Sequence, residues 1–194
     1  MKSLYEQRVS RRRFLSGLAG LGFGLVGLRG LASAAAKFDS RFELMVEVEI
    51  NSIMERRVHR PYVAVWIEDA KGNAVRTLAL WVQNSGRGPR WIPDLRRWFG
   101  EEETRKQAKG GDLVQSISSA TRNAGKYQLV FNGKDDAGQT ISQGDYYLCI
   151  EAAREHGTYQ LIREKLSFGT KLYKKDIEGN IEIKGAKVDF RKRT

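Results

Sequence analysis

Few residues in this 194-residue chain have the types and spacing that chemistry requires. Cys149 is the only cysteine and lies in the apolar run 146–153, so we interpret it as a small core residue with a raised thiol pKa. His59 and His156 are far apart and lack the spacing of zinc ligands, so no metal site is predicted. No Ser-His-Asp order, nucleophile elbow or carboxylate pair indicates a hydrolase. The sequence therefore favours a protein without catalytic activity, although it leaves that question open.

A second group of residues combines aromatic rings with guanidinium groups. Trp91, Arg96, Arg97, Trp98 and Arg122 could offer stacking faces and charged forks to a planar anion such as a flavin. The same residues could instead pack a short helix on a sheet, with tryptophan inward and arginine outward. We favour the packing interpretation and keep Arg96, Trp98 and Arg122 as candidate cofactor-binding residues.

The formal net charge of +11 raises the question of nucleic acid, because clustered cations release counterions from phosphates. Six cations and one acid fall in the first 36 residues, so the remaining chain is only moderately basic. We interpret this surplus as a solvated surface and predict no nucleic-acid partner.

The N-terminus carries the features of an export signal. Residues 10–16 read S-R-R-R-F-L-S and resemble the twin-arginine translocation signature, which rests here on Arg11, Arg12, Phe14 and Leu15. The apolar stretch 15–28 is too short to span a bilayer. Small residues at 32–34 and 34–36 allow signal peptidase to cleave before Ala35 or before Lys37. The resemblance implies a periplasmic protein, with the translocase and signal peptidase as partners. We divide the chain into a cleavable leader, 1–36, and a domain, 37–194, with retention of the leader as an anchor as the alternative.

The chain after the leader has the pattern of an all-β protein. Residues 41–50 alternate strictly, which predicts a half-buried antiparallel strand. Apolar runs separated by Gly, Asp and Asn turns predict further strands at 62–68, 75–82, 127–131, 146–153 and 159–168, and a last edge hairpin within 171–194. Short strands at this spacing predict an antiparallel β-sandwich.

Only one segment departs from the strand pattern. Pro93 precedes Leu95, Trp98 and Phe99, whose three- and four-residue spacing predicts one short amphipathic helix packed on the sandwich. Residues 101–111 are charged without apolar periodicity, so we predict a loop there.

One pair of turns resembles immunoglobulin-like modules. Residues 132–138 form a turn-rich segment, and Gly144-Asp145-Tyr146 then begins a strand. Tyr146 could pack at a sandwich corner and donate its hydroxyl to a backbone carbonyl. We therefore predict an immunoglobulin-like sandwich.

Four blocks of sequence resemble a family of predicted periplasmic proteins of unknown function. They are residues 59–66, 91–98, 118–122 and 151–155, within a resemblance that spans about 42–190. The resemblance implies a partnership with FAD:protein FMN transferases or membrane-anchored redox proteins. At the end of the last block we interpret Arg154 and Glu155 as an ion pair.

The third block is similar to the motif at which flavin transferases attach FMN through its phosphate to a threonine. Residues 115–121 read Q-S-I-S-S-A-T, so Ser118, Ala120 and Thr121 match the motif D-x-x-S/T-G-A-T. Gln115 replaces the acid and Ser119 replaces the glycine, which allows conformations that serine resists. The alternative is a Ser/Thr turn leading into the next strand.

Two functions from different classes are thus open. The first is a non-catalytic periplasmic accessory or binding module serving a flavin-linked or membrane redox system, and we rank it first. The second is a periplasmic electron carrier that holds FMN covalently at Thr121.

Overall fold

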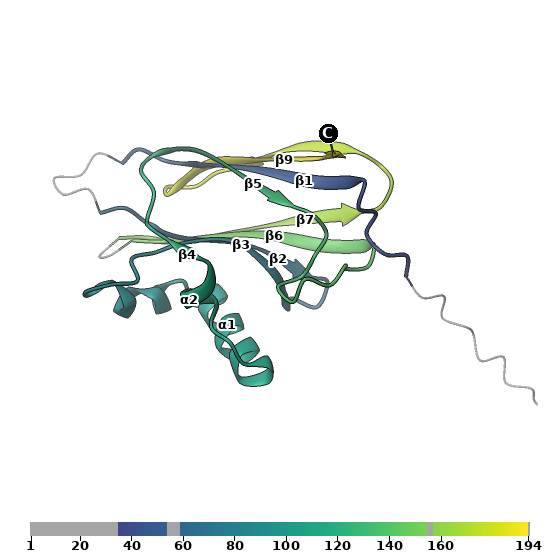
Figure 1. Ribbon diagram of the computed structural model, residues 1–194. Coiled ribbons are helices and arrows are strands. Elements are labelled where there is room, and N and C mark those ends of the chain that lie inside the picture. The colour runs from purple at the N-terminus through teal and green to yellow at the C-terminus, as the bar shows by residue number, and fades with distance from the viewer. Residues whose placement is uncertain (1–34, 54–58, 155–156, 194) are drawn as a thin grey trace, which may run out of the picture. The chain divides into compact units, whose positions relative to one another are not determined.

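The computed structural model describes residues 35–53, 59–154 and 157–193 (Figure 1). The twin-arginine segment lies outside these residues. The strands are β1 (Phe42–Ile50), β2 (Tyr62–Asp69), β3 (Ala74–Trp81), β4 (Ser118–Ser119), β5 (Gly125–Phe131), β6 (Gly144–Ala153), β7 (Tyr159–Phe168), β8 (Tyr173–Glu178) and β9 (Ile183–Lys192). The helical segments are the 3-10 helix η1 (Gly88–Asp94), α1 (Arg96–Lys109) and α2 (Leu113–Ile117). None of the helices in these ranges is long and apolar enough to cross a membrane.

The strands form the two sheets of a β-sandwich, which confirms the predicted fold class. One sheet has the order β5-β1-β9-β8 and the other β4-β3-β2-β6-β7. All pairs are antiparallel except β3 with β4, where Leu80 lies opposite Ser118. The chain therefore leaves one sheet at β4 and enters the other at β5, and residues 120–124 make that crossing. Figure 1 shows η1, α1 and α2 together beside the β2-β3 part of the five-stranded sheet.

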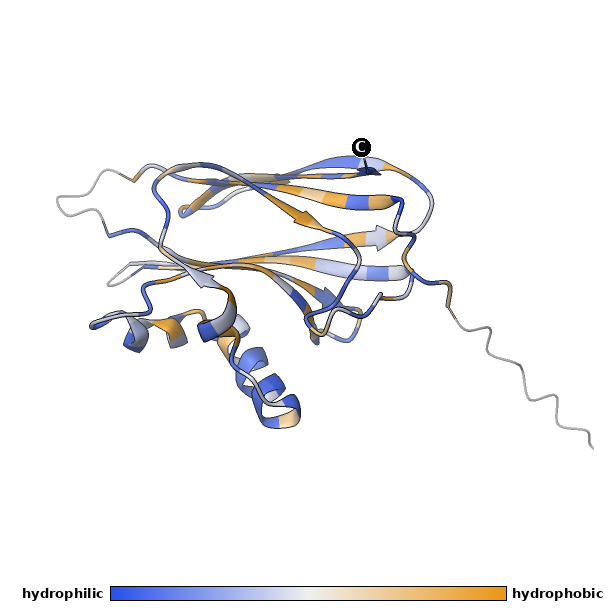
Figure 2. Ribbon diagram, viewed as in Figure 1, coloured by the Kyte–Doolittle hydropathy of each residue, from blue (hydrophilic) through white to orange (hydrophobic). Residues whose placement is uncertain are grey.

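The main core fills the space between the sheets. The five apolar residues that alternate along β1 all face inward, as predicted: Phe42, Leu44, Val46, Val48 and Ile50. Strand β2 is buried on both faces from Tyr62 to Glu68, because the sandwich core covers one face and the helical segments cover the other. Figure 2 shows the corresponding hydrophobic colouring along the strands that face each other.

Three local predictions concern turns, and the structure confirms all three. Asp69 accepts backbone N–H bonds from Lys71 and Asn73, at 2.8 and 2.9 Å, and so closes the β2-β3 hairpin. The Tyr146 hydroxyl donates to the Ser142 carbonyl at 2.8 Å, which is the corner contact expected of an immunoglobulin-like sandwich. Strands β8 and β9 form the C-terminal hairpin. Of the two strands in this hairpin, only β8 lies at the edge of its sheet, since β9 also pairs with β1.

The helical region is more extensive than the sequence predicts. Residues 101–109, predicted as a loop, continue α1 to Lys109, and Pro93 lies in η1 before the α-helix begins. Charged and straight-chain residues have high helix propensity without any apolar stripe. The buried Glu102 carboxylate also accepts two bonds from Arg105, at 2.6 and 2.7 Å, which stabilises this turn.

Candidate functional site

The outer face of the five-stranded sheet carries a second apolar core beneath the helices. Trp66 and Leu80 project from the sheet, and Leu95 and Trp98 meet them from the start of α1. Trp98 is only 1% exposed, and its indole nitrogen donates to the Thr77 hydroxyl at 3.2 Å. The Trp98 side chain is therefore part of this apolar core, which agrees with the packing interpretation.

A fully buried carboxylate, Glu68, connects three elements in this layer. Arg97 donates to it through Nε and Nη2, at 2.7 and 2.9 Å, and Arg163 donates through Nε at 2.9 Å. Trp66 donates its indole N–H at 3.1 Å. Burial opposes ionisation, but the bonds from Arg97 and Arg163 outweigh it and lower the pKa of Glu68. Glu68 is therefore a charged link between β2, α1 and β7.

A second buried carboxylate, Glu151 of β6, caps α1. It accepts the backbone N–H groups of Arg97 and Trp98, at 2.9 and 2.8 Å, and so satisfies donors that a helix start leaves unpaired. Burial, followed by interaction with Glu151, raises the pKa of Tyr159 to about 12. The guanidinium of Arg96 lies 4.6 Å from the centroid of the Tyr159 ring.

A third buried carboxylate, Glu182, joins the two sheets at their end. Arg154 donates to it through Nε and Nη2, with a shortest distance of 2.7 Å, and also donates to the His59 carbonyl. Thr158 adds a hydroxyl bond to Glu182 at 3.0 Å. Glu155 lies outside the described residues, so its pairing with Arg154 stays a prediction.

In the helical layer, the buried carboxylates Glu68 and Glu151 thus serve to hold α1 against the sheet. Cys149, also fully buried there, has its pKa raised chiefly by burial, as expected for a core thiol. Across the described ranges, no group of three or more His, Cys, Asp or Glu side chains could hold a metal ion.

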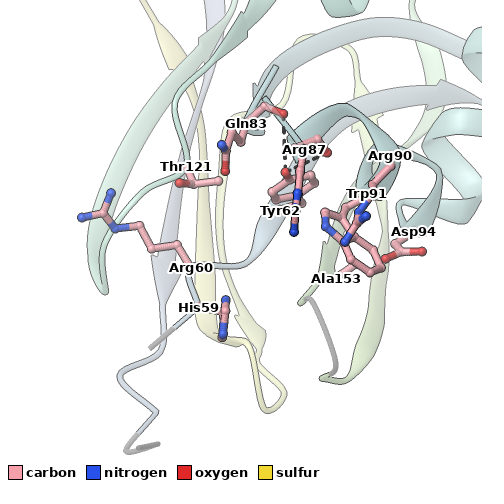
Figure 3. Close-up of a pocket in the computed structure, with 11 residues that line it drawn as sticks. His59, Arg60, Tyr62, Gln83, Arg87, Arg90, Trp91, Asp94, Thr121 and Ala153 are labelled. Carbon is pink, nitrogen blue, oxygen red and sulfur yellow. Dashed lines mark hydrogen bonds between the residues drawn. The ribbon is translucent and has the colours of Figure 1, made fainter. Parts of the chain in front are cut away.

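One cleft of about 410 Å³ lies between the end of η1, the start of β2 and the crossing loop after β4 (Figure 3). It is lined by His59, Arg60, Tyr62, Gln83, Arg87, Gly88, Arg90, Trp91, Asp94, Thr121 and Ala153. We call it the arginine cleft. Figure 3 shows the Tyr62 ring at its centre, with Arg60 and Thr121 on one side and Trp91 and Asp94 on the other.

The geometry of the arginine cleft is fixed by backbone contacts. The Tyr62 hydroxyl donates to the Gly88 carbonyl at 3.0 Å, which holds the first turn of η1 against β2. Gly88 itself packs on Gln83, whose carbonyl would lie 2.3 Å from any Cβ at position 88. Only glycine fits at this approach, so the loop before η1 has a defined position over Tyr62.

The charges of the arginine cleft are unbalanced. Within residues 59–154, Arg60, Arg87 and Arg90 form no ion pair with a described carboxylate, in contrast to Arg97 and Arg154, which pair with the buried carboxylates Glu68 and Glu182. The guanidinium of Arg90 lies 4.7 Å from the centroid of the Trp91 ring. Three cations and one carboxylate, Asp94, thus surround an aromatic surface, an arrangement that suits an anion with a planar ring.

Of the five candidate cofactor-binding residues, which are Arg96, Trp98, Ser118, Thr121 and Arg122, Thr121 alone lines the arginine cleft. Ser118 lies in β4, where its hydroxyl accepts from the Asn84 amide at 3.1 Å. Arg122 lies 5.8 Å from the centroids of both the Trp81 and the Tyr127 rings. Arg96 stacks on Tyr159 as described, so the five predicted residues do not form one site.

Comparison with known families then places the chain. A family model described as predicted periplasmic protein (DUF2271) matches residues 43–185. The chain belongs to this family. No curated protein and no solved structure matches it.

The DUF2271 match includes both the helical layer and the arginine cleft. Each of the four blocks that carried the resemblance contains residues of the cleft, which are His59, Arg60 and Tyr62 in the first, Trp91 and Asp94 in the second, Thr121 in the third and Ala153 in the fourth. No sequence pattern indicated Arg87 and Arg90 as site residues, because a Gly-Pro-rich loop is an ordinary connection unless its position in space is known.

Proposed function

We propose that this protein is a non-catalytic periplasmic accessory module, exported by the twin-arginine route, that serves a flavin-linked membrane redox system. Its binding site is the arginine cleft, and the ligand is an anion with a planar ring. One observation carries the proposal: Arg60, Arg87 and Arg90 line the same aromatic cleft without pairing to a described carboxylate.

The physical support is the contrast between this cleft and the rest of the domain. Uncompensated arginines that share one concave surface favour an anion, because guanidinium forks match phosphate oxygens. A volume of about 410 Å³ lies within the range of small-molecule sites. The buried carboxylates Glu68, Glu151 and Glu182 are engaged by arginines or by the start of a helix, and are therefore poor candidates for general acid–base catalysis.

The test is a fluorescence titration of the purified domain with FMN and with riboflavin, which lacks the phosphate. We expect FMN to bind. Arg87→Gln should weaken the affinity for FMN roughly 10-fold or more, which is the effect of losing one charge-assisted hydrogen bond. Lys174→Gln is the matched control, because that exposed lysine lies on the other sheet. No binding of FMN, or equal binding by the Arg87 variant, would contradict the proposal.

A second candidate is an electron carrier with FMN attached covalently at Thr121. The supporting observation is that Thr121 lines the same cleft as the three arginines. In this reaction the Thr121 hydroxyl attacks the FMN phosphorus of FAD, the P–O–P bond breaks, AMP leaves and the hydroxyl proton passes to solvent. The replacements at Gln115 and Ser119 weigh against it.

Co-expression with an FAD:protein FMN transferase and measurement of the intact mass tests this candidate. We expect an FMN adduct that Thr121→Val abolishes and Ser118→Ala retains, since the Ser118 side chain contacts Asn84 instead of the cleft. An unmodified protein would exclude covalent flavin while leaving the binding module in place.

A further inference from the structure

The two candidate cleavage positions of the leader differ in their structural surroundings. Small residues precede both the Ala34–Ala35 and the Ala36–Lys37 bonds, so the sequence alone does not choose between them. Ala34 lies outside the described residues. Ala35 and the residues that follow are described, and their contacts distinguish the two bonds.

The Ala36–Lys37 bond is part of a short strand pairing. Gln143 donates its backbone N–H to the Ala36 carbonyl at 2.6 Å and its side-chain amide to the Lys37 carbonyl at 3.1 Å. Lys37 forms an isolated β-bridge with Ser142. No hydrogen bond within residues 35–53 and 59–154 engages Ala35, which is exposed.

Phe38 anchors this segment directly after the second bond. It is 5% exposed, and its N–H donates to the Ile141 carbonyl at 2.9 Å. Its ring lies edge-on to Phe131, Phe168 and Phe190, with centroids at 5.9, 5.4 and 5.9 Å. A Cβ on Gly133 would lie 2.1 Å from the Phe38 ring, so the surrounding backbone is shaped around this side chain.

A protease that binds its substrate as an extended strand needs several free residues on both sides of the scissile bond. Proteins of the twin-arginine route fold before export, so the peptidase meets a folded domain. Cleavage after Ala36 would require Phe38, the second residue beyond that bond, to leave the core. Cleavage after Ala34 requires only the single backbone bond at Ala36 to open.

We propose that signal peptidase hydrolyses the Ala34–Ala35 bond and that the mature protein begins at Ala35. Water adds across the peptide C–N bond, which leaves a carboxylate on Ala34 and an amine on Ala35. This inference rests on the proposed export route and moves the boundary of the mature chain two residues before the predicted Lys37.

The experiment is N-terminal sequencing and intact-mass measurement of the periplasmic product of the full-length chain. We expect one product that begins at Ala35. Ala32→Lys, which removes a small residue required only for the first position, should cause the precursor to accumulate, whereas Ala36→Lys should leave processing unchanged. A product that begins at Lys37 overturns this inference alone. An intact precursor in the cytosol overturns the export route and this inference together.

A variant of the anchor tests the physical cause. Phe38→Ala frees the segment, so a second product beginning at Lys37 should appear beside the first. A single product beginning at Ala35 from this variant would overturn the role of the Phe38 anchor in selecting the bond. The two alanine-to-lysine variants keep the choice of bond testable if Phe38→Ala does not fold, since Ala36 is exposed and Ala32 precedes both candidate cleavage bonds.

Discussion

The Arg97 guanidinium and the Glu68 carboxylate form a two-pronged pair, with Nε to Oε1 at 2.7 Å and Nη2 to Oε2 at 2.9 Å. Glu68 is fully buried, whereas the Arg97 side chain is 35% exposed. The pair connects the centre of the five-stranded sheet to the first turn of α1. It therefore fixes the start of α1, and α1 directly follows η1, the segment that lines the arginine cleft.

Removing this negative charge should destabilise the domain. Glu68→Gln leaves two arginines, Arg97 and Arg163, without their carboxylate, and we expect a loss of about 2 kcal/mol in the free energy of unfolding. This value is below the full effect of breaking a buried pair, because both arginines are about one-third exposed. Urea denaturation measures the change. Glu49→Gln is the control, because it removes a half-buried carboxylate on β1 whose nearest partner is the exposed Lys184. An equal loss in the two variants would contradict the role of Glu68.

Glu68 should also make the stability of the domain depend on pH in the acid range. The pKa of Glu68 is lower in the folded protein than its ordinary value of 4.5, so the folded state binds its proton less readily than the unfolded state. Its contribution is present above about pH 4.5 and is lost as the pH falls through the folded pKa. Urea midpoints should therefore fall more steeply below pH 4.5 in the native protein than in Glu68→Gln. Parallel profiles would show that Glu68 does not contribute to this loss.

Tyr159 should make the stability of the domain depend on pH in the alkaline range. Its folded pKa of about 12 exceeds the ordinary value of 10, so the stability it contributes is present below pH 10 and is lost as the pH rises through about 12. Ultraviolet titration of the phenols should show a late component that Tyr159→Phe removes in part. Part of this component should remain, because the pKa of Tyr173 is also raised to about 12, chiefly by burial.

The cap at Glu151 should act locally. Glu151→Ala removes the acceptor for the Arg97 and Trp98 amides, and losing a helix cap costs about 0.5–2 kcal/mol. Hydrogen exchange should accelerate first in α1, and in β6 only with global unfolding. Asp135→Ala, which removes the acceptor for the backbone N–H groups of Ala137 and Gln139 in the turn between β5 and β6, should leave exchange in α1 unchanged.

Cys149 should be inert toward thiol reagents. The side chain is fully buried and burial raises its pKa, so thiolate and access are both lacking. Reaction with a colorimetric disulfide reagent should require urea concentrations that unfold the domain. Rapid reaction of the native protein would show that the layer between α1 and the sheet opens readily.

The sequence determined those parts of this protein that depend on neighbours along the chain. Strict alternation in β1, turn residues at Asp69 and the Gly-x-Tyr start of β6 each act within a few residues, so two sheets and their hairpins were predictable. Residues 101–109 were not, because this helix depends on propensity and on the buried Glu102 instead of on an apolar stripe.

The tertiary structure alone decided the site. Arg60, Arg87 and Thr121 come from three separate segments, and only the packing of η1 against Tyr62 and the crossing from β4 to β5 bring them to one cleft. Likewise, nothing in sequence connects Glu68 to Arg163 across 95 positions. A side chain's local pattern fixes which face of its strand is buried, whereas the charge that it meets there depends on which distant strand or helix packs against that face.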